Sequence, residues 1–326
     1  MPVEWTADPT AFRSRDWISL VESDPDATVF HGPKYLELYW EEFGSGPPQL
    51  AFVRNDDEII CVAAFEVSEG IAKFLGGFEI TDYMGPVGRR QGRERAAEDL
   101  MAALEERDDW ETADLRGLPL DGGWYGAIAD GARVAGLVVE KDDDGVAPLL
   151  PLSSSFPAYM SSLPGKLRHE LRRKRRRIHQ ALPSAALVDA TTSTFASDLT
   201  AFAQLHRASR GRKGRFMHPG MERFFQRLGD ALLPDGTFRL VFLESEGTKL
   251  AGAVGFRDRS RFLVYNSAYD HTQAALSPGI VLLTMLVEDL FDQGCEALDL
   301  LKGDEEYKSQ LGALPRPIGR LLLRRR

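Results

Sequence analysis

Residues 237–269 read TFRLVFLESEGTKLAGAVGFRDRSRFLVYNSAY. Three runs rich in apolar and β-branched residues predict successive strands near 237–244, 249–257 and 261–269. The turn signal Ser245-Glu246-Gly247 joins the first two as a hairpin. A helical pattern near 278–293 and a strand pattern near 296–301 follow. This order predicts an α/β unit in which a helix covers a mostly antiparallel sheet.

The same order of elements occurs earlier in the chain. Strands are predicted near 50–54, 58–67 and 71–76, a helix near 92–107 and a strand near 111–116. Asn55-Asp56-Asp57 is the matching hairpin turn. The distance from turn to helix is roughly 35 residues in the first copy and roughly 33 in the second, which favours an internal duplication. Chance likeness between two α/β units is the alternative.

Length and composition agree with two globular units. The chain has 326 residues, 43% hydrophobic and 27% charged, with 30 Gly and 18 Pro that follow no period. Disordered and collagen-like classes are excluded, and a chain this long needs no metal or disulfide for its core. Prolines 148, 151 and 157 mark a junction, so we expect units at 1–150 and 151–326. Helices near 194–209 and 218–231 are expected to open the second unit.

Charge is concentrated in one segment after the junction. Residues 166–177 read KLRHELRRKRRR, with eight Lys or Arg and one Glu, within a chain of net charge −9. Leu163, Leu167, Leu171 and Ile178 form one helical stripe, which predicts a packed basic helix over 163–180. Three interpretations remain open: a solvated helix between domains, a site for a phosphate-bearing ligand, or contact with nucleic acid or an anionic membrane surface.

Other features set the expected environment. Cys61 and Cys295 lie in apolar surroundings and are predicted to be free, buried thiols. No stretch approaches the length of a membrane span, and the first residues lack the pattern of a signal peptide. The expected location is therefore the cytoplasm. The six histidines show no ligand spacing, and no metal site is expected.

Three strands, a helix and a further strand resemble the core of GNAT-type acyltransferases. That resemblance implies that the pyrophosphate of acyl-CoA binds to unpaired amides at the start of the helix near 278. Ser277 is expected to cap this helix, Pro278 to occupy its first position and Gly279 to allow close approach of a ligand, with Ile280 beside them. The sequence keeps only Gly279 of the usual glycine fingerprint.

The segment Leu298–Gly312, LDLLKGDEEYKSQLG, resembles the ending of the CelD/BioF-like acetyltransferase family, which has two GNAT-like units. The segments FHGPKYL at 30–36 and KLRHELRR at 166–173 agree with it, so the resemblance spans about residues 25–315. Gly303 of the ending joins the expected cofactor-binding residues. The Tyr-Lys pair is also similar to the ending of Fem-type aminoacyl transferases, which share the double fold and use aminoacyl-tRNA.

The ending supplies the candidate catalytic residues. Lys308 is expected to stabilise an oxyanion or hold a phosphate, and the Fem-type resemblance implies a functional lysine there. Tyr307 is the candidate general acid, as GNAT enzymes often use a tyrosine after the fifth strand. Asp299, among apolar residues, is a candidate base. The alternative for Lys308 is a surface lysine, that for Tyr307 is an aromatic residue packed on the sheet, and that for Asp299 is a structural hydrogen bond.

Two loops supply candidate substrate contacts. Asp82 and Tyr83 lie in the strand-to-helix loop of the first unit, where Asp82 could orient or deprotonate the acceptor; a simple turn is the alternative. Arg212 and Lys213 lie in a glycine-punctuated basic loop at 210–215, suited to an anionic substrate or, equally, to a solvated connection.

We therefore expect an α/β (α+β) fold of two tandem GNAT-like units, each a mixed, mostly antiparallel sheet flanked by helices. The resemblance implies an N-acyltransferase that moves an acyl group, acetyl first, from acetyl-CoA or another acyl-CoA to a small-molecule amine. An amino sugar or a cell-envelope precursor is the expected acceptor, and no metal is expected. The alternatives are transfer from aminoacyl-tRNA and an inactive double-GNAT binding scaffold. These motifs do not determine the oligomeric state.

Overall fold

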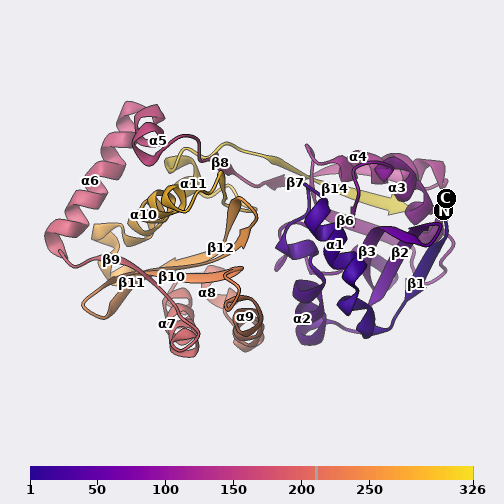
Figure 1. Ribbon diagram of the computed structural model, residues 1–326, viewed down its shortest axis with the longest axis horizontal. Coiled ribbons are helices and arrows are strands. Elements are labelled where there is room, and N and C mark those ends of the chain that lie inside the picture. Colours follow the sequence, from indigo (N-terminus) through magenta and orange to yellow (C-terminus); the bar gives the residue numbers. More distant parts are fainter. Residues whose placement is uncertain (210–211, 326) are drawn as a thin grey trace. The chain divides into compact units, whose positions relative to one another are not determined.

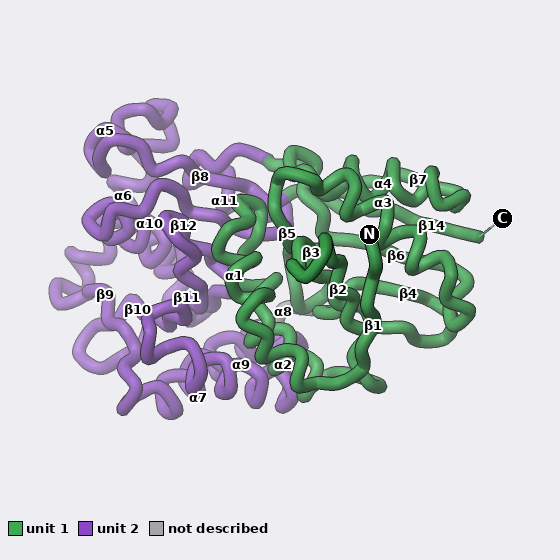
Figure 2. Tube along the Cα trace, turned by 45° about the vertical axis from the view of Figure 1, so that its right-hand side comes forward, with its two compact units in different colours: residues 1–146, 316–326 green, residues 147–315 purple. Residues whose placement is uncertain are grey.

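In the computed structural model, the chain folds into two compact units (Figures 1 and 2). Unit 1 contains residues 1–146 and 316–326, and unit 2 contains residues 147–315. The structure describes residues 1–209 and 212–325, and the side chains of residues 212 and 213 lie outside this description. The boundary lies close to the expected one at 150, but residues 316–326 belong to unit 1 rather than to unit 2.

Unit 1 is a mixed sheet with helices on both faces. Its strands are β1 (Val3–Thr6), β2 (Gln49–Asn55), β3 (Glu58–Ser68), β4 (Ile71–Phe74), β5 (Val87–Gly88), β6 (Thr112–Pro119), β7 (Val138–Val146) and β14 (Pro317–Arg324). Its helices are α1 (Arg15–Ser23), α2 (Pro33–Phe43), α3 (Arg93–Glu105) and α4 (Gly123–Val134), with 3-10 turns η1 (Pro9–Arg13) and η2 (Val29–His31).

The sheet of unit 1 has the order β1-β2-β3-β4-β6-β14-β7, and β5 adds to β3. β4 and β6 are parallel, whereas the other pairs are antiparallel. Ala51, Val53 and Cys61 face the main core, which α3 and α4 cover. Phe52 points to the other face and meets Trp17 of α1 edge-on. This alternation is what a strand period of two requires.

Unit 2 repeats the arrangement. Its strands are β8 (Leu149–Pro151), β9 (Ala186–Asp189), β10 (Phe238–Ser245), β11 (Thr248–Asp258), β12 (Arg261–Tyr269) and β13 (Ala297–Asp299). Its helices are α5 (Phe156–Ser162), α6 (Gly165–Ala181), α7 (Phe195–Arg207), α8 (Arg212–Phe216), α9 (Pro219–Leu232), α10 (Pro278–Asp292) and α11 (Glu306–Gln310), with the 3-10 segment η3 (His271–Leu276).

The predicted three-strand meander is confirmed as β10, β11 and β12 in a sheet of order β8-β13-β12-β11-β10-β9. Here β12 and β13 form the parallel pair, as β4 and β6 do in unit 1, so the predicted repeat is present in the topology. Figure 1 shows α10 on one face of this sheet and α7 and α9 on the other. The apolar side chains of α10 join Val241 and Leu243 in a core that also includes α5 and α6.

The predicted basic helix is confirmed as α6. It begins at Gly165 and ends at Ala181, and its Leu171 and Ile178 are buried in the core that contains α10. An ion pair of 2.6 Å between Arg175 and Glu288 of α10 adds to this packing. The helix is thus a fixed part of unit 2, with its arginines distributed over the remaining faces.

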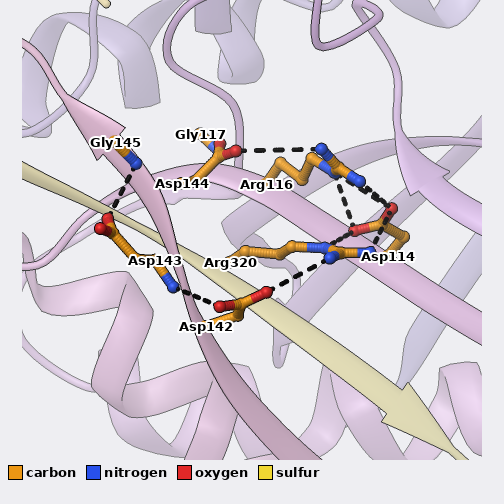
Figure 3. A network of polar contacts seen from close by, with 8 residues as sticks. All are labelled: Asp114, Arg116, Gly117, Asp142, Asp143, Asp144, Gly145 and Arg320. Carbon is orange, nitrogen blue, oxygen red and sulfur yellow. Dashed lines mark hydrogen bonds and ion pairs between the residues drawn. The ribbon is translucent and has the colours of Figure 1, made fainter. Parts of the chain in front are cut away.

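The C-terminal strand was not predicted from the sequence. β14 inserts between β6 and β7 of unit 1, and its Ile318, Leu321 and Leu323 are buried. Arg320 on this strand hydrogen-bonds both carboxylate oxygens of Asp114, and Asp114 also binds Arg116 (Figure 3). Strand pairing is non-local, so the residues of β14 alone could not indicate which sheet they join.

We expect Asp114→Asn to lower the free energy of unfolding by about 2 kcal/mol at neutral pH, because hydrogen bonds to an ionised carboxylate are lost. Burial alone would raise the pKa of Asp114, but hydrogen bonds from Arg320 and Arg116 outweigh burial and hold the pKa below its usual range. The stabilisation is therefore present above an unfolded-state pKa of about 3.9 and is lost as the pH falls towards the lower folded-state value.

Urea denaturation at pH 7 and at pH 3.5 measures this effect. The stability gap between wild type and Asp114→Asn should be smaller at the lower pH. Asp130→Asn is the matched control, since Asp130 forms an exposed ion pair with Arg133 and should change stability little. A gap that does not depend on pH would contradict the assignment.

Candidate active site in unit 2

The two parallel strands of unit 2 separate soon after they pair. β12 and β13 are paired only through Arg261–Leu263 and Ala297–Asp299. β12 then continues beside β11 to Tyr269, and a register shift leaves Tyr265 as an extra, bulged residue. The carboxyl ends of diverging strands leave a crevice where α/β sheets commonly bind ligands.

A cavity of about 300 Å³ lies among the elements that follow this divergence. Its wall comprises Lys174 of α6, Ser267, Ala268 and Tyr269 of β12, Ala274 of η3, Ser277, Gly279, Ile280 and Leu283 at the start of α10, and Glu306, Tyr307 and Gln310 of α11. The predicted cofactor-binding segment and the predicted catalytic tyrosine therefore share one cavity, although about 30 residues separate them in sequence.

The start of α10 forms one side of this cavity. Pro278 is the first helical residue, as expected, but Ser277 has a left-handed backbone and its side chain makes no capping hydrogen bond. The amides of Gly279 and Ile280 have no acceptor within a helix that starts at Pro278, so they can bind an anion. A Cβ atom on Gly279 would lie 3.3 Å from the Tyr269 ring, which explains the small residue there.

The basic helix α6 contributes a cation to the same wall. The side chain of Lys174 is 14% exposed, and the nearest carboxylate that pairs with it is that of Glu170 at 3.8 Å. One turn further on, Arg177 donates a 2.7 Å hydrogen bond to the carbonyl of Ala275 and so fixes the segment before α10. A positive side chain beside the positive end of a helix favours a phosphate group.

α11 contributes the polar residues Glu306, Tyr307 and Gln310 to the cavity wall. Tyr307 is half-buried on its wall, and Glu306 is exposed, with its carboxylate accepting a 2.9 Å hydrogen bond from Gln310. Tyr307 is therefore placed where its phenol can contact a bound molecule. A phenol can donate a proton and a carboxylate can attract an ammonium group, so the pair can serve acyl transfer to an amine.

Lys308 has a different position from the one expected. Its side chain is buried, and Nζ donates hydrogen bonds to the carbonyls of Leu301, Lys302 and Gly303 at 2.9, 3.0 and 3.2 Å. The Glu305 carboxylate lies 3.0 Å from Nζ. Because an ammonium group has three donors, these contacts occupy it fully. Lys308 thus holds the loop between β13 and α11, and the predicted catalytic role of its ammonium group stays a prediction.

The other residues of this ending also stabilise that loop. Asp299 is buried and accepts a 2.8 Å hydrogen bond from the amide of Leu301, which corresponds to the structural alternative and not to a base on the cavity wall. Gly303 has a φ of +126°, and a Cβ atom there would lie 2.4 Å from the Glu305 carboxylate. Its glycine is explained by loop geometry, because its contacts are with Glu305 and Lys308 and not with the cavity.

The two candidates from the first unit differ from each other. Tyr83 is 1% exposed and packs against Phe30 beneath the Arg316 guanidinium, so a substrate cannot reach it without rearrangement. Asp82 is half-buried in its loop. The same loop is held by a 3.2 Å hydrogen bond from the backbone amide of Met84 to the carbonyl of Gly117. A role for Asp82 toward an acceptor stays a prediction. The expected loop at 210–215 is wrong for Arg212 and Lys213, which begin the helix α8; their side chains lie outside the described residues.

Cys61 and Cys295 are free and buried, as predicted, and burial raises the pKa of both thiols. Among the described residues, no three His, Cys, Asp or Glu side chains are grouped so as to hold a metal ion. Over residues 1–209 and 212–325, none of the helices combines the length and apolar character needed to cross a bilayer.

Sequence reasoning missed Lys174 as a site residue. The leucine stripe of the basic helix carried the signal, because position 174 lies three residues after Leu171 and four before Ile178. A lysine on the packed face of a helix needs either a cavity or a polar partner for its ammonium group, because burying an unpaired charge is unfavourable. Ser267, inside the predicted strand 261–269, was also missed as a lining residue of the cavity.

We expect Lys308→Met to lower the free energy of unfolding by about 2–4 kcal/mol, because three buried carbonyl groups lose their donor. Lys166→Met, at an exposed position on α6, is the control and should leave stability unchanged. Thermal and urea denaturation measure the difference. A Lys308→Met protein as stable as wild type but without activity would instead assign the ammonium group to a bound ligand.

Comparison with known proteins identifies the fold. Residues 165–309, from the start of α6 into α11, match the family model described as acetyltransferase (GNAT) domain. A search of the curated proteins gives no significant match. Among solved structures, the chain resembles FemX with a TM-score of 0.69 and 12% identity, over 98% of this chain and 96% of that one.

Two further structures cover nearly the whole chain. The C-terminal domain (DUF2156) of a putative lysylphosphatidylglycerol synthetase from Agrobacterium fabrum aligns with a TM-score of 0.63 and 12% identity, over 98% of this chain and 93% of that one. A tandem GNAT protein from the clavulanic acid biosynthesis pathway aligns with a TM-score of 0.51 and 12% identity, over 99% of this chain and 98% of that one. At such identities the likeness concerns the fold, which is that of two GNAT-like units in tandem, with a match to the GNAT acetyltransferase domain in unit 2.

Proposed function

We propose that this protein is a GNAT-type acyltransferase that moves an acyl group, acetyl in the first instance, from coenzyme A to an amine. The cavity in unit 2 carries the proposal, because the start of α10 and Tyr307 line it together. The match of residues 165–309 to the GNAT acetyltransferase domain supports the reaction class. The CelD/BioF-like resemblance belongs to the same proposal.

The donor is held by its nucleotide end. The amides of Gly279 and Ile280 bind the pyrophosphate, and Lys174 neutralises part of its charge. The distribution of charge favours this unit for an anionic donor. Unit 2 has 22 basic and 18 acidic side chains, a net charge of +4, whereas unit 1 has 18 and 31, a net charge of −13. An anion is therefore steered toward unit 2.

The reaction joins the amine to the acyl carbon. The nitrogen lone pair attacks the thioester carbonyl, the carbon–sulfur bond breaks, and the nitrogen loses a proton to a base or to water. Tyr307 donates its phenolic proton to the departing thiolate and regains one from solvent. The products are an amide and free coenzyme A. Glu306, on the same wall, attracts the amine and can accept its proton.

The acceptor is a small amine, and an amino sugar or a cell-envelope precursor is the proposed class. The direct test measures thiol release from a panel of acyl-CoA donors with amine acceptors, followed by mass spectrometry of the product. Isothermal titration with acetyl-CoA and with CoA provides the second measurement. A folded protein that gives neither heat nor thiol release would instead favour the inactive scaffold.

Transfer from an aminoacyl-tRNA is the second candidate. The exposed arginines of α6 favour it, since Arg172 and Arg176 could contact RNA phosphates. This reaction would require RNA, and its rate would fall steeply with salt. Activity that needs charged tRNA and ignores acyl-CoA would replace the first proposal with the second.

We expect Tyr307→Phe to reduce turnover by about 10²-fold to 10⁴-fold, because the general acid is removed while the ring is kept. Thermal stability should change little. Tyr269→Phe is the matched control, since it removes a phenolic hydroxyl from the same cavity wall without removing the proposed acid. Equal turnover of wild type and Tyr307→Phe would remove Tyr307 from the mechanism.

We expect Lys174→Met to weaken CoA binding by about tenfold, the value of one charge-assisted contact of about 1.4 kcal/mol. Binding of pantetheine, which lacks the phosphates, should be unaffected. Arg173→Gln is the control, because Arg173 pairs with Glu170 at the surface and does not line the cavity. Titration calorimetry measures the affinities of wild type and both variants for CoA and for pantetheine. An equal loss for CoA and pantetheine would show that Lys174 acts on the fold and not on a phosphate.

A further inference from the structure

Unit 2 has a second cavity that the proposed reaction does not use. It is a groove of about 800 Å³ between α5 and the outer face of α6. Phe156, Pro157 and Met160 of α5 line it together with His169, Arg172, Arg175, Arg176, His179 and Gln180 of α6. This volume lies within the range of about 300–1,000 Å³ found for small-molecule sites.

The α6 side of the groove is a cationic face. His169, Arg172, Arg176 and His179 follow one another at intervals of three, four and three residues, so they share one face of the helix. Arg172 and Arg176 are exposed and form no ion pair with any described residue. Other cations of α6 are engaged, such as Arg173 with Glu170 and Arg177 with the Ala275 carbonyl. Arg172 and Arg176 thus bring two unpaired positive charges to the groove.

The α5 side of the groove is apolar and held in place. Phe156 contacts Phe291 of α10 and Tyr159 in an aromatic cluster, and Tyr159 donates a 2.8 Å hydrogen bond to the Leu311 carbonyl. Met160 is 4% exposed and belongs to the core. The apolar side of the groove, formed by Phe156, Pro157 and Met160, is therefore already in place before a ligand binds. This preorganisation lowers the conformational entropy lost on binding.

The apolar side of the groove favours an aliphatic chain over a nucleic-acid base. The Arg175 guanidinium lies 5.3 Å from the centre of the Phe156 ring and is itself paired with Glu288, so this aromatic face is already covered. Pro157 and Met160 supply aliphatic contacts, whereas single-stranded nucleic acid is bound by stacking on open aromatic rings. The strongly negative charge of unit 1 also opposes a long polyanion.

We propose that this groove binds an amphiphilic anion, namely a phosphate-bearing lipid whose phosphate contacts Arg172 and Arg176 and whose acyl chain lies on Pro157 and Met160. The ligand is held as a single molecule in the groove. Arginine pairs well with phosphate because its planar donors match the phosphate oxygens. The site is distinct from the cavity at the start of α10, which lies on the other side of α6 and is lined by Lys174.

The test uses the full chain and short-chain lipids below their micelle concentration, with binding measured by titration calorimetry. Dihexanoyl phosphatidic acid should bind at least tenfold more tightly than glycerol 3-phosphate or dihexanoyl phosphatidylcholine. Each methylene that enters the groove should raise the affinity by up to about fourfold. The dibutanoyl and dihexanoyl pair measures that increment.

The double variant Arg172→Gln/Arg176→Gln should lose at least tenfold in affinity for dihexanoyl phosphatidic acid. Arg168→Gln/Arg173→Gln is the matched control, because it removes the same charge from α6 at positions outside the groove and should bind as wild type does. Circular dichroism and thermal denaturation establish that both variants are folded. Unchanged CoA affinity in the Arg172→Gln/Arg176→Gln protein would separate this site from the proposed donor site.

Three results would overturn the proposal. Equal affinity for glycerol 3-phosphate and the short-chain lipid would mean that the groove attracts charge only. A single-stranded RNA oligomer that binds more tightly than the lipid, with loss in the Arg172→Gln/Arg176→Gln variant, would assign the face to nucleic acid. Binding to vesicles of phosphatidylglycerol and phosphatidylcholine without any binding of the monomeric lipid would assign α6 to a membrane surface and not to a single ligand.

Discussion

The short parallel pairing of β12 with β13 is the constraint on which the candidate site depends. A parallel pair needs a crossover connection, and here that connection is α10, which must begin near the end of β12 and return to the start of β13. Because the pairing stops after three residues on each strand, the end of β12, the start of α10 and α11 surround an open space instead of a closed core. The start of α10, Tyr307 and Lys174 line that space together, and the proposed anion binding and proton transfer rest on this arrangement.

Lys308 holds the loop that leads to the cavity without lining the cavity itself. Burying an ammonium group is unfavourable unless every donor finds an acceptor, and three carbonyls of one loop meet that requirement. Asp299 fastens the same loop from the strand side. Together they determine where α11 starts, and with it the positions of Glu306 and Tyr307. The Tyr-Lys pair therefore combines one side chain that lines the cavity with one that fixes its neighbour.

The basic helix α6 has separate roles on separate faces. Leu171 and Ile178 pack into the core, Lys174 enters the cavity beside α10, and Arg172 and Arg176 face the groove beside α5. Of the three interpretations that its composition left open, a phosphate-bearing ligand agrees best with the position of Lys174. The net charges of the two units also favour an anionic ligand at unit 2, because unit 2 is positively charged and unit 1 is strongly negative.

Local pattern was sufficient for the elements that repeat. The alternation in 237–269, its turns and the leucine stripe of α6 are short-range signals, and they determined the meander, the repeat and the packed basic helix. The segments at 277–280 and 307 were predicted as site residues from the sequence, and the structure places residues of both on the wall of one cavity. Only the tertiary structure shows that Lys308 donates hydrogen bonds to three carbonyl groups and that Tyr83 is buried. It also shows that Lys174 lines the cavity and that β14 pairs within the sheet of unit 1. Each of these depends on contacts between residues that are distant in sequence or on burial, and neither is encoded in the spacing of residues along the chain.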